Sequence, residues 1–200
     1  MLKRIFDISA SLAAIVLLAV PMLLIAIAIR LESPGKAIFK QKRAGFRGKP
    51  FTILKFRTMR ADVNPYGDSP HSATDGRLTR VGRLLRQTSL DELPQLFNVL
   101  MGTMSLVGPR PLYERQAQMW DDRQRRRLDA RPGITGYAQM YGRANLTIED
   151  KIELDLYYVD NLSWRLDFTI ILRTITGILH SRDDIYERQY SKSKKRESDS

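Results

Sequence analysis

The sequence contains no cysteine and only two histidines, His71 and His180. The absence of cysteine excludes disulfides, thiolate metal sites and a cysteine nucleophile. Two histidines are too few for a multi-histidine zinc site and leave little material for a histidine-based triad. Aromatic residues make up only 8% of the chain, which is few for a surface that stacks nucleic-acid bases. Any chemistry must therefore come from carboxylates, basic residues and a bound ion.

Acidic residues are also in the minority. Lysine and arginine number 33 against 22 aspartates and glutamates, so the net charge is +11. This balance favours anionic partners such as nucleic acid, anionic lipid headgroups or phosphorylated substrates. A length of 200 residues suits one compact domain with its own core and is too short for two large ones.

One apolar segment, Ile8 to Ile29, is long enough to enter a membrane. As a straight helix it would cover about 33 Å, enough to cross a hydrocarbon core of ~30 Å. The segment is longer than the apolar region of a secretory signal, and no small-residue cleavage pattern follows it. A single transmembrane anchor is therefore one interpretation.

Two features favour a helix that returns to the face it entered. Pro21 lies inside the segment and cannot donate a backbone hydrogen bond, so we expect a break near this residue. Basic residues flank both ends, beginning with Lys3 and Arg4, whereas a spanning helix concentrates positive charge on one side. The sequence thus predicts a re-entrant membrane helix over residues 1–31 and a domain on the cytoplasmic face over residues 32–187.

The remaining chain predicts a helix-dominant α/β domain with a small β-hairpin. Strand-like residues at 37–43 and 51–57 are separated by a glycine-containing turn. Helical spacing and capping residues predict four helices, over residues 93–101, 112–128, 147–159 and 166–179. The last helix is too short to span a bilayer and is either core or an interfacial amphipathic helix. Residues 61–79 form a polar loop and residues 188–200 a disordered polar tail.

An acidic pair, Asp91 and Glu92, occurs near the predicted start of the helix over 93–101. Acidic residues at this place complement the helix dipole, and Ser89 with Glu92 fits a capping box. The functional alternative makes Asp91 a nucleophile that attacks a phosphoryl group. Asp91 and Glu92 would then also hold a hard cation such as Mg²⁺ together with substrate phosphates.

Three arginines downstream of this pair favour the functional alternative. Arg110, Arg131 and Arg143 each lie on a turn that contains proline or glycine. Forked guanidinium groups held on rigid turns suit bidentate binding of phosphate. A single arginine of this kind is usually a surface ion pair, but three beside an acidic pair and a membrane segment indicate a phosphate-binding site.

The chain also resembles a known family through four motifs. They are Lys55-Phe56-Arg57-Thr58-Met59, Ser89-Leu90-Asp91-Glu92-Leu93-Pro94-Gln95, Gly108-Pro109-Arg110-Pro111 and Arg131-Pro132-Gly133-Ile134-Thr135-Gly136. In order and spacing they resemble the bacterial sugar transferases, and more narrowly the small monotopic polyprenol-phosphate phosphoglycosyl transferases. The resemblance covers residues 1–185. Because longer members carry extra membrane helices and another domain ahead of this core, we expect this chain to be the minimal form.

The resemblance implies a re-entrant helix broken at Pro21 and a catalytic dyad of Asp91 and Glu92. It also implies Mg²⁺, a UDP-sugar donor, undecaprenyl phosphate as acceptor, and a covalent phosphosugar intermediate on Asp91. The implied location is the cytoplasmic face of the bacterial inner membrane, at the first membrane step of a glycoconjugate pathway such as exopolysaccharide, O-antigen or capsule synthesis. A homodimer and downstream membrane glycosyltransferases are partners that the resemblance allows. The sugar itself is not specified.

Further residues enter as supporting candidates. Lys55 and Arg57 are additional phosphate contacts, and Asp155 either orients one of the arginines or forms a structural ion pair. Some family members have serine before the helix-breaking proline, where this chain has Val20, so the geometry of the break is expected to differ. The rival interpretation is a non-catalytic, basic, membrane-tethered binding protein. Nucleic-acid binding is disfavoured by the few aromatics and the membrane segment.

Overall fold

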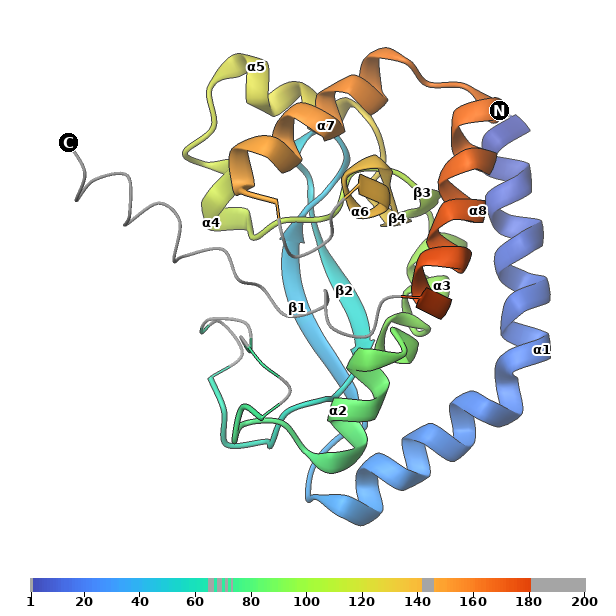
Figure 1. Ribbon diagram of the computed structural model, residues 1–200, viewed down its shortest axis with the longest axis vertical. Coiled ribbons are helices and arrows are strands. Elements are labelled where there is room, and N and C mark those ends of the chain that lie inside the picture. The colour runs from blue at the N-terminus through green and yellow to red at the C-terminus, as the bar shows by residue number, and fades with distance from the viewer. Residues whose placement is uncertain are drawn as a thin grey trace.

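The computed structural model describes residues 2–64, 67, 70, 72, 74–141 and 146–180. A two-stranded hairpin runs through the middle of the molecule, and the long helix α1 (Leu2–Glu32) lies along one side (Figure 1). Helix α8 (Trp164–His180) lies beside the N-terminal part of α1, and α7 (Ile148–Asp160) lies near one end of the hairpin. The predicted helix-dominant α/β class is confirmed. The predicted tail over 188–200 lies outside the described residues, as does part of the loop over 61–79.

Helix α1 is continuous over 31 residues and contains Pro21. The predicted break is therefore a bend within one helix, visible partway along α1 in Figure 1. A proline in a helix removes one backbone hydrogen bond and crowds the preceding turn, which bends the helix without requiring that it end. In the part of the chain that the structure describes, α1 is the one helix long and apolar enough to cross a membrane, with a mean hydropathy of 3.0 in its most apolar window.

The predicted hairpin is confirmed. Strands β1 (Ile38–Ala44) and β2 (Pro50–Phe56) pair antiparallel, from Ile38 opposite Phe56 to Ala44 opposite Pro50. The short 3₁₀ turn η1 (Phe46–Gly48) connects them. Phe51 and Ile53 of β2 both face the interior, while Thr52 between them is exposed, which is the alternation of a half-buried strand. Phe51 and Ile53 pack with Val99 and Met104. This cluster holds the hairpin against helix α3 (Gln95–Leu100).

A second, parallel pair of strands was not predicted. Strands β3 (Ser105–Val107) and β4 (Gly133–Thr135) are three residues long. A Cβ on Gly108 would lie 2.1 Å from the carbonyl oxygen of Arg131, and one on Gly133 would lie 2.1 Å from the nitrogen of Gly108. The glycines of the two motifs are therefore packing residues that let these backbones approach each other.

The remaining helices agree in part with the predictions. The Asp150 amide donates to Thr147 Oγ1 at 3.1 Å, so the predicted N-cap of α7 is confirmed. The single helix predicted over 112–128 is wrong. Asp121 accepts from the amide of Gln124 at 2.7 Å and so begins a new helix inside this range. The observed elements are α4 (Glu114–Ala117), α5 (Asp122–Arg125) and η3 (Arg126–Asp129). A short helix that precedes α7, α6 (Tyr137–Tyr141), was not predicted.

The N-terminal end of α1 is bound to the rest of the domain through polar groups. Arg4 donates to the carbonyls of Val99 and Leu100 at 2.5 and 2.9 Å and so caps α3. Asp7 is 3% exposed and accepts from Ser105 Oγ and the Leu106 amide at 2.8 and 3.1 Å. These contacts fix this end of α1 on α3 and β3.

The C-terminal end of α1 is bound to the same domain. Glu32 accepts from the amides of Arg80 and Val81 at 2.6 and 3.0 Å, at the start of helix α2 (Arg80–Gln87). Met22 and Ile29 of α1 pack with Phe56 and Leu85. Both ends of the apolar helix are therefore held by one domain.

Candidate active site

The acidic pair lies on a 3₁₀ turn, η2 (Leu90–Glu92), between α2 and α3. Ser89, just before it, has φ 57°, in the left-handed region that costs a non-glycine residue about 1 kcal/mol or more. Its side chain makes no capping hydrogen bond, so the capping-box interpretation of Ser89 and Glu92 is wrong. The left-handed residue turns the chain after α2, and Asp91 points inward and is buried.

Two cations from distant parts of the sequence meet at Glu92. Lys55 Nζ, from β2, lies 2.7 Å from Glu92 Oε1, and Arg110, from the turn after β3, lies 3.2 Å from the same oxygen. Burial by itself would raise the pKa of Glu92, but these two cations outweigh it and lower the pKa well below its ordinary value. Glu92 is therefore ionised at neutral pH. Burial also lowers the pKa of Lys55.

Asp91 differs sharply from its neighbour. Its side chain is buried, with the residue 7% exposed, yet it accepts no hydrogen bond within the described part of the chain. Burial is the largest cause that raises the pKa of Asp91, to about 6, and the charge of Glu92 adds to it against the opposing effect of Lys55. A carboxylate that is ionised near neutral pH and poorly solvated is a competent nucleophile.

Among the described residues, the arrangement places a carboxylate without a hydrogen-bond partner, that of Asp91, beside a carboxylate that two cations hold, that of Glu92. The half-exposed guanidinium of Arg110 and the ammonium of Lys55 supply positive charge where a phosphate group could approach Asp91. Arg86, in the last turn of α2, also acts electrostatically on Asp91. Arg86 was not among the site residues predicted from the sequence. Its position five residues before Asp91, one helical turn ahead of η2, is the signal that could have found it.

Comparison with known proteins shows the family of this chain. A family model described as bacterial sugar transferase matches residues 1–181. The chain belongs to the bacterial sugar transferase family. It is 44% identical to the uncharacterized sugar transferase EpsL of Bacillus subtilis over 180 residues, 90% of this chain and 88% of that protein.

Two further relatives have more specific names. The UDP-glucose:undecaprenyl-phosphate glucose-1-phosphate transferase of Caulobacter vibrioides is 43% identical over 196 residues, 92% of this chain and 72% of the relative. The UDP-N-acetylgalactosamine-undecaprenyl-phosphate N-acetylgalactosaminephosphotransferase of Aeromonas hydrophila is 42% identical over 184 residues, 89% of this chain and 44% of the relative. Relatives of this sugar transferase thus act on different UDP-sugars with one lipid acceptor.

The oxygens of this sugar transferase's acidic pair fit a magnesium ion in chemical type. Glu92 Oε1 is taken by Lys55 and Arg110, while no hydrogen bond reaches Oε2 or the carboxylate of Asp91 from any described residue. The described residues contain no group of three or more His, Cys, Asp and Glu that could hold a metal ion. A fully protein-built site is therefore absent from that part of the chain. One or two carboxylates completed by substrate phosphates and water are the ligands that Mg²⁺ commonly uses.

The structure does not bring Arg57 of the sugar transferase to the acidic pair. Its guanidinium is buried and donates to the carbonyls of Ile29 and Ser33 at 3.4 and 2.8 Å and to that of Pro34. Arg57 therefore caps the C-terminal end of α1, and its assignment as a phosphate contact is corrected. The capping role follows from the orphan carbonyls that every helix end presents.

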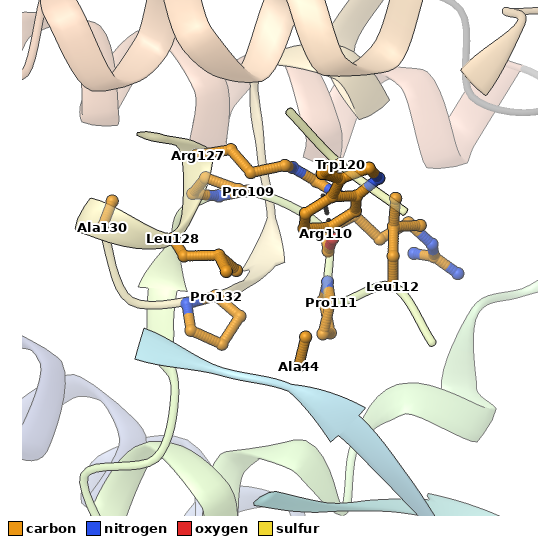
Figure 2. Close-up of a pocket in the computed structure, with 10 residues that line it drawn as sticks. All are labelled: Ala44, Pro109, Arg110, Pro111, Leu112, Trp120, Arg127, Leu128, Ala130 and Pro132. Atoms are coloured by element: carbon orange, nitrogen blue, oxygen red, sulfur yellow. Dashed lines mark hydrogen bonds between the residues drawn. The ribbon is translucent and has the colours of Figure 1, made fainter. Parts of the chain in front are cut away.

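Among the described candidates, Arg131 and Asp155 make no hydrogen bond or ion pair with the acidic pair. Arg131 donates to the carbonyl of Gly102 at 3.1 Å and lies 5.2 Å from the ring of Phe46, on the exposed surface near η1. Arg143 lies outside the described residues. Asp155 is fully buried and pairs with Arg127, a residue that the sequence analysis did not single out. Arg127 in turn donates to the carbonyl of Arg110 at 2.9 Å (Figure 2).

Proposed function

We propose that this protein transfers a sugar phosphate from a UDP-sugar to undecaprenyl phosphate, giving undecaprenyl-diphosphate sugar and UMP. One observation carries the proposal: the carboxylate of Asp91, buried and without a hydrogen-bond partner among the described residues, lies beside Glu92, whose charge is held by Lys55 and Arg110. The names of the relatives supply the substrate class. A non-catalytic binding protein of the same charge would give no reason to bury an ionisable group without a partner.

The reaction has two half-reactions. A carboxylate oxygen of Asp91 attacks the sugar-proximal phosphorus of the donor, and the bond from that phosphorus to the bridging oxygen breaks. UMP leaves with the electron pair, and an acyl phosphate joins Asp91 to the sugar. A phosphate oxygen of undecaprenyl phosphate then attacks the same phosphorus and releases the Asp91 carboxylate. Splitting one displacement into two in this way is the advantage of a covalent nucleophile.

The surrounding residues have separate tasks. Lys55 and Arg110 draw the donor's phosphates toward Asp91 and oppose the negative charge that develops on them. Asp91 and Glu92 would hold Mg²⁺, which when bound neutralises charge on the pyrophosphate. The exposed guanidinium of Arg131 and the side chain of Arg143 remain predicted phosphate contacts.

The covalent step is tested by intact-protein mass spectrometry. The protein is incubated with Mg²⁺ and UDP-glucose or UDP-N-acetylgalactosamine, without lipid acceptor. The expected result is a mass gain of one sugar phosphate that Asp91→Asn lacks and that added undecaprenyl phosphate removes. Asp62→Asn, at an exposed ion pair with Arg60, is the matched control and should form the adduct. Turnover with lipid but no adduct without it would mean direct transfer and would remove Asp91 as nucleophile.

We also propose that the protein is monotopic on the cytoplasmic face of the inner membrane. Both ends of α1 are bonded to one domain, which supports a helix that enters and leaves the bilayer on one face. The outer face of α1 exposes a row of large apolar side chains, namely Leu12, Val16, Leu17, Val20, Leu23, Leu24 and Ile27. An apolar surface of this size is stable only against lipid or protein.

Helix α8 extends this surface. Trp164, Phe168, Leu172 and Ile175 are exposed at helical spacing, and the first two contact Phe6 of α1 with ring centroids 5.6 and 5.8 Å apart. The membrane would therefore meet α8 as an interfacial helix beside α1. The acidic pair belongs to the same domain as this apolar surface, so membrane binding would hold it close to the layer in which undecaprenyl phosphate moves.

The absence of cysteine makes a labelling test of this topology direct. Single cysteines at Leu2 and Lys36 mark the two ends of α1, and one at the exposed Leu17 marks its middle. In inside-out vesicles, a membrane-impermeant maleimide should label both ends, whereas Leu17→Cys should react only after detergent is added. Labelling of the ends from opposite faces would refute the monotopic arrangement.

A further inference from the structure

The turn that carries Arg110 is bonded to the fold through several carbonyl groups, including that of Pro111, which accepts from Arg43 Nη1 at 3.5 Å. The Gly133 amide donates to the carbonyl of Pro109 at 3.0 Å, and the Ala44 amide donates to that of Leu112 at 3.1 Å. Arg110's own carbonyl instead accepts from a side chain, Nη2 of Arg127, at 2.9 Å. The carbonyl of Arg110 is therefore held by Arg127, and its position depends on where Arg127 lies.

Arg127 is held by a buried ion pair. It lies on η3, is 2% exposed and pairs with Asp155 of α7, which is 0% exposed. Its guanidinium also lies 4.9 Å from the centre of the Trp120 ring. Burying two charges is costly, and an apolar pair of the same volume is often as stable. Stability alone therefore does not account for a buried pair at this place.

We propose that Arg127, held by Asp155, is a positioning residue that fixes the backbone of Arg110 so that its guanidinium stays on Glu92. Figure 2 shows Arg127 reaching the carbonyl of Arg110, while the Arg110 side chain extends away from the apolar pocket that holds its two flanking prolines. This inference rests on the proposed function, because it gives Arg110 a task at the reacting phosphate.

The geometry explains why such an anchor is needed. Pro109 and Pro111 fix their own φ angles but have no N–H with which to hold the turn. Arg110 is long and half-exposed, so a small rotation of its backbone moves the guanidinium by an ångström or more. Misplacement by about 1 Å can lower an enzyme's rate by ~10²-fold.

A double-mutant cycle tests the proposal. Arg110→Met removes the guanidinium, and the pair variant Arg127→Met/Asp155→Leu removes both buried charges together, so that neither is left unpaired. The rate of adduct formation with the active UDP-sugar is measured for each variant and for their combination. We expect losses of ~10²-fold for Arg110→Met and at least ~10-fold for the pair variant. The combination should lose no more than Arg110→Met alone, because the anchor acts only through Arg110.

The neighbouring pair provides a matched control. Arg126 and Asp160 join the same η3 and α7, but their side chains are 52% and 47% exposed and pair with each other. Arg126→Met/Asp160→Leu should leave the adduct rate within ~2-fold of the wild type. Arg127→Lys, which keeps a charge on Asp155, serves as a second variant should the pair variant fail to fold. Arg127→Lys should lower the maximal rate of adduct formation more than it lowers the apparent affinity for the donor. In the presence of Arg110→Met, Arg127→Lys should cause no further loss of rate.

The outcomes separate the two proposals. Losses that multiply in the combined variant would show that Arg127 acts independently of Arg110 and would overturn the positioning role. The positioning role would also be overturned if Arg126→Met/Asp160→Leu lowered the adduct rate as much as Arg127→Met/Asp155→Leu. Failure of the proposed function is a different result, because the wild type itself would then form neither adduct nor product with any UDP-sugar.

Discussion

Replacing Asp91 with asparagine should make the protein more stable while it abolishes the covalent step. Asp91 is buried without a hydrogen-bond partner among the described residues, and its pKa is raised from 3.8 to about 6. A raised folded-state pKa means that the folded protein binds more protons than the unfolded chain between these two pH values. Stability therefore falls as the pH rises through this window, and the ionised side chain destabilises the fold above it.

The size of the effect follows from the shift. About two pKa units, at about 1.4 kcal/mol per unit, correspond to about 3 kcal/mol of unfolding free energy at neutral pH. Asparagine has nearly the same shape and is neutral at every pH, so it avoids this cost. We expect Asp91→Asn to be on the order of 1–3 kcal/mol more stable than the wild type above pH ~7. The difference should shrink between pH ~6 and ~4 and vanish below.

The assay is urea unfolding in detergent micelles from pH 4 to pH 8, followed by tryptophan fluorescence. Asp155→Asn is the contrasting variant, because it leaves Arg127 as a buried charge without its carboxylate partner and should lose about 3–5 kcal/mol. Asp62→Asn, at a side chain 69% exposed, should change nothing measurable. If Asp91→Asn is no more stable than the wild type at pH 8, the ionised Asp91 carboxylate does not lower the free energy of unfolding. The inference that Asp91 is a poorly solvated nucleophile would then be wrong.

Three further substitutions separate the site from its support. Lys55→Met removes a cation that lowers the pKa of Asp91. The acid limb of the pH profile of adduct formation should therefore move up by about one pH unit, and Lys55→Arg should move it less. An acid limb that does not move would contradict the electrostatic role of Lys55. Arg57→Leu leaves the C-terminal end of α1 uncapped and should lower the melting temperature, while the folded protein keeps the wild-type rate of adduct formation. A loss of this rate without a loss of stability would show that Arg57 does contact the substrate. Gly133→Ala places a Cβ 2.1 Å from the nitrogen of Gly108 and should lower the free energy of unfolding by more than about 3 kcal/mol. Gly76→Ala, with no heavy atom within 4 Å of the added Cβ, should lower it by under about 1 kcal/mol. Equal urea midpoints for the two variants would contradict the close packing at Gly133.

Local signals in the sequence were sufficient for the elements that they encode. The hairpin of β1 and β2 follows from alternation interrupted by a glycine-containing turn. The start of α7 follows from Thr147, whose side chain caps the amide three residues later. The proximity of Asp91 and Glu92 is fixed by adjacency in the chain. Arg110 was predicted as a phosphate contact from its proline-containing turn, and Lys55 as an additional one, but their pairing with Glu92 was not predicted, because no local signal links residues so far apart.

Non-local packing explains what the sequence analysis missed. Strands β3 and β4 are three residues long, too short for an alternating pattern to be recognised. The glycines beside them were interpreted as parts of phosphate-binding turns, whereas they let two backbones come together. Arg57 stands in a motif with Lys55, but alternate residues of a strand share a face only while the strand stays regular, and β2 ends at Phe56. The guanidinium of Arg57 consequently reaches the end of α1.

The basic residues at the start of α1 require a different explanation from the one that the sequence suggested. Positive charge on both flanks favoured a re-entrant helix because a spanning helix concentrates its positive charge on one side. In the fold, Lys3 pairs with Asp167 of α8 and Arg4 caps α3, so these charges are largely engaged by the protein. Asp7 completes this attachment from inside the apolar helix. An acidic residue there would be costly in lipid, and it is stable because β3 supplies its two donors. The attachment of α1 at both ends, more than the sign of its flanking charges, thus supports the monotopic arrangement, and it holds the apolar helix to the domain that carries Asp91.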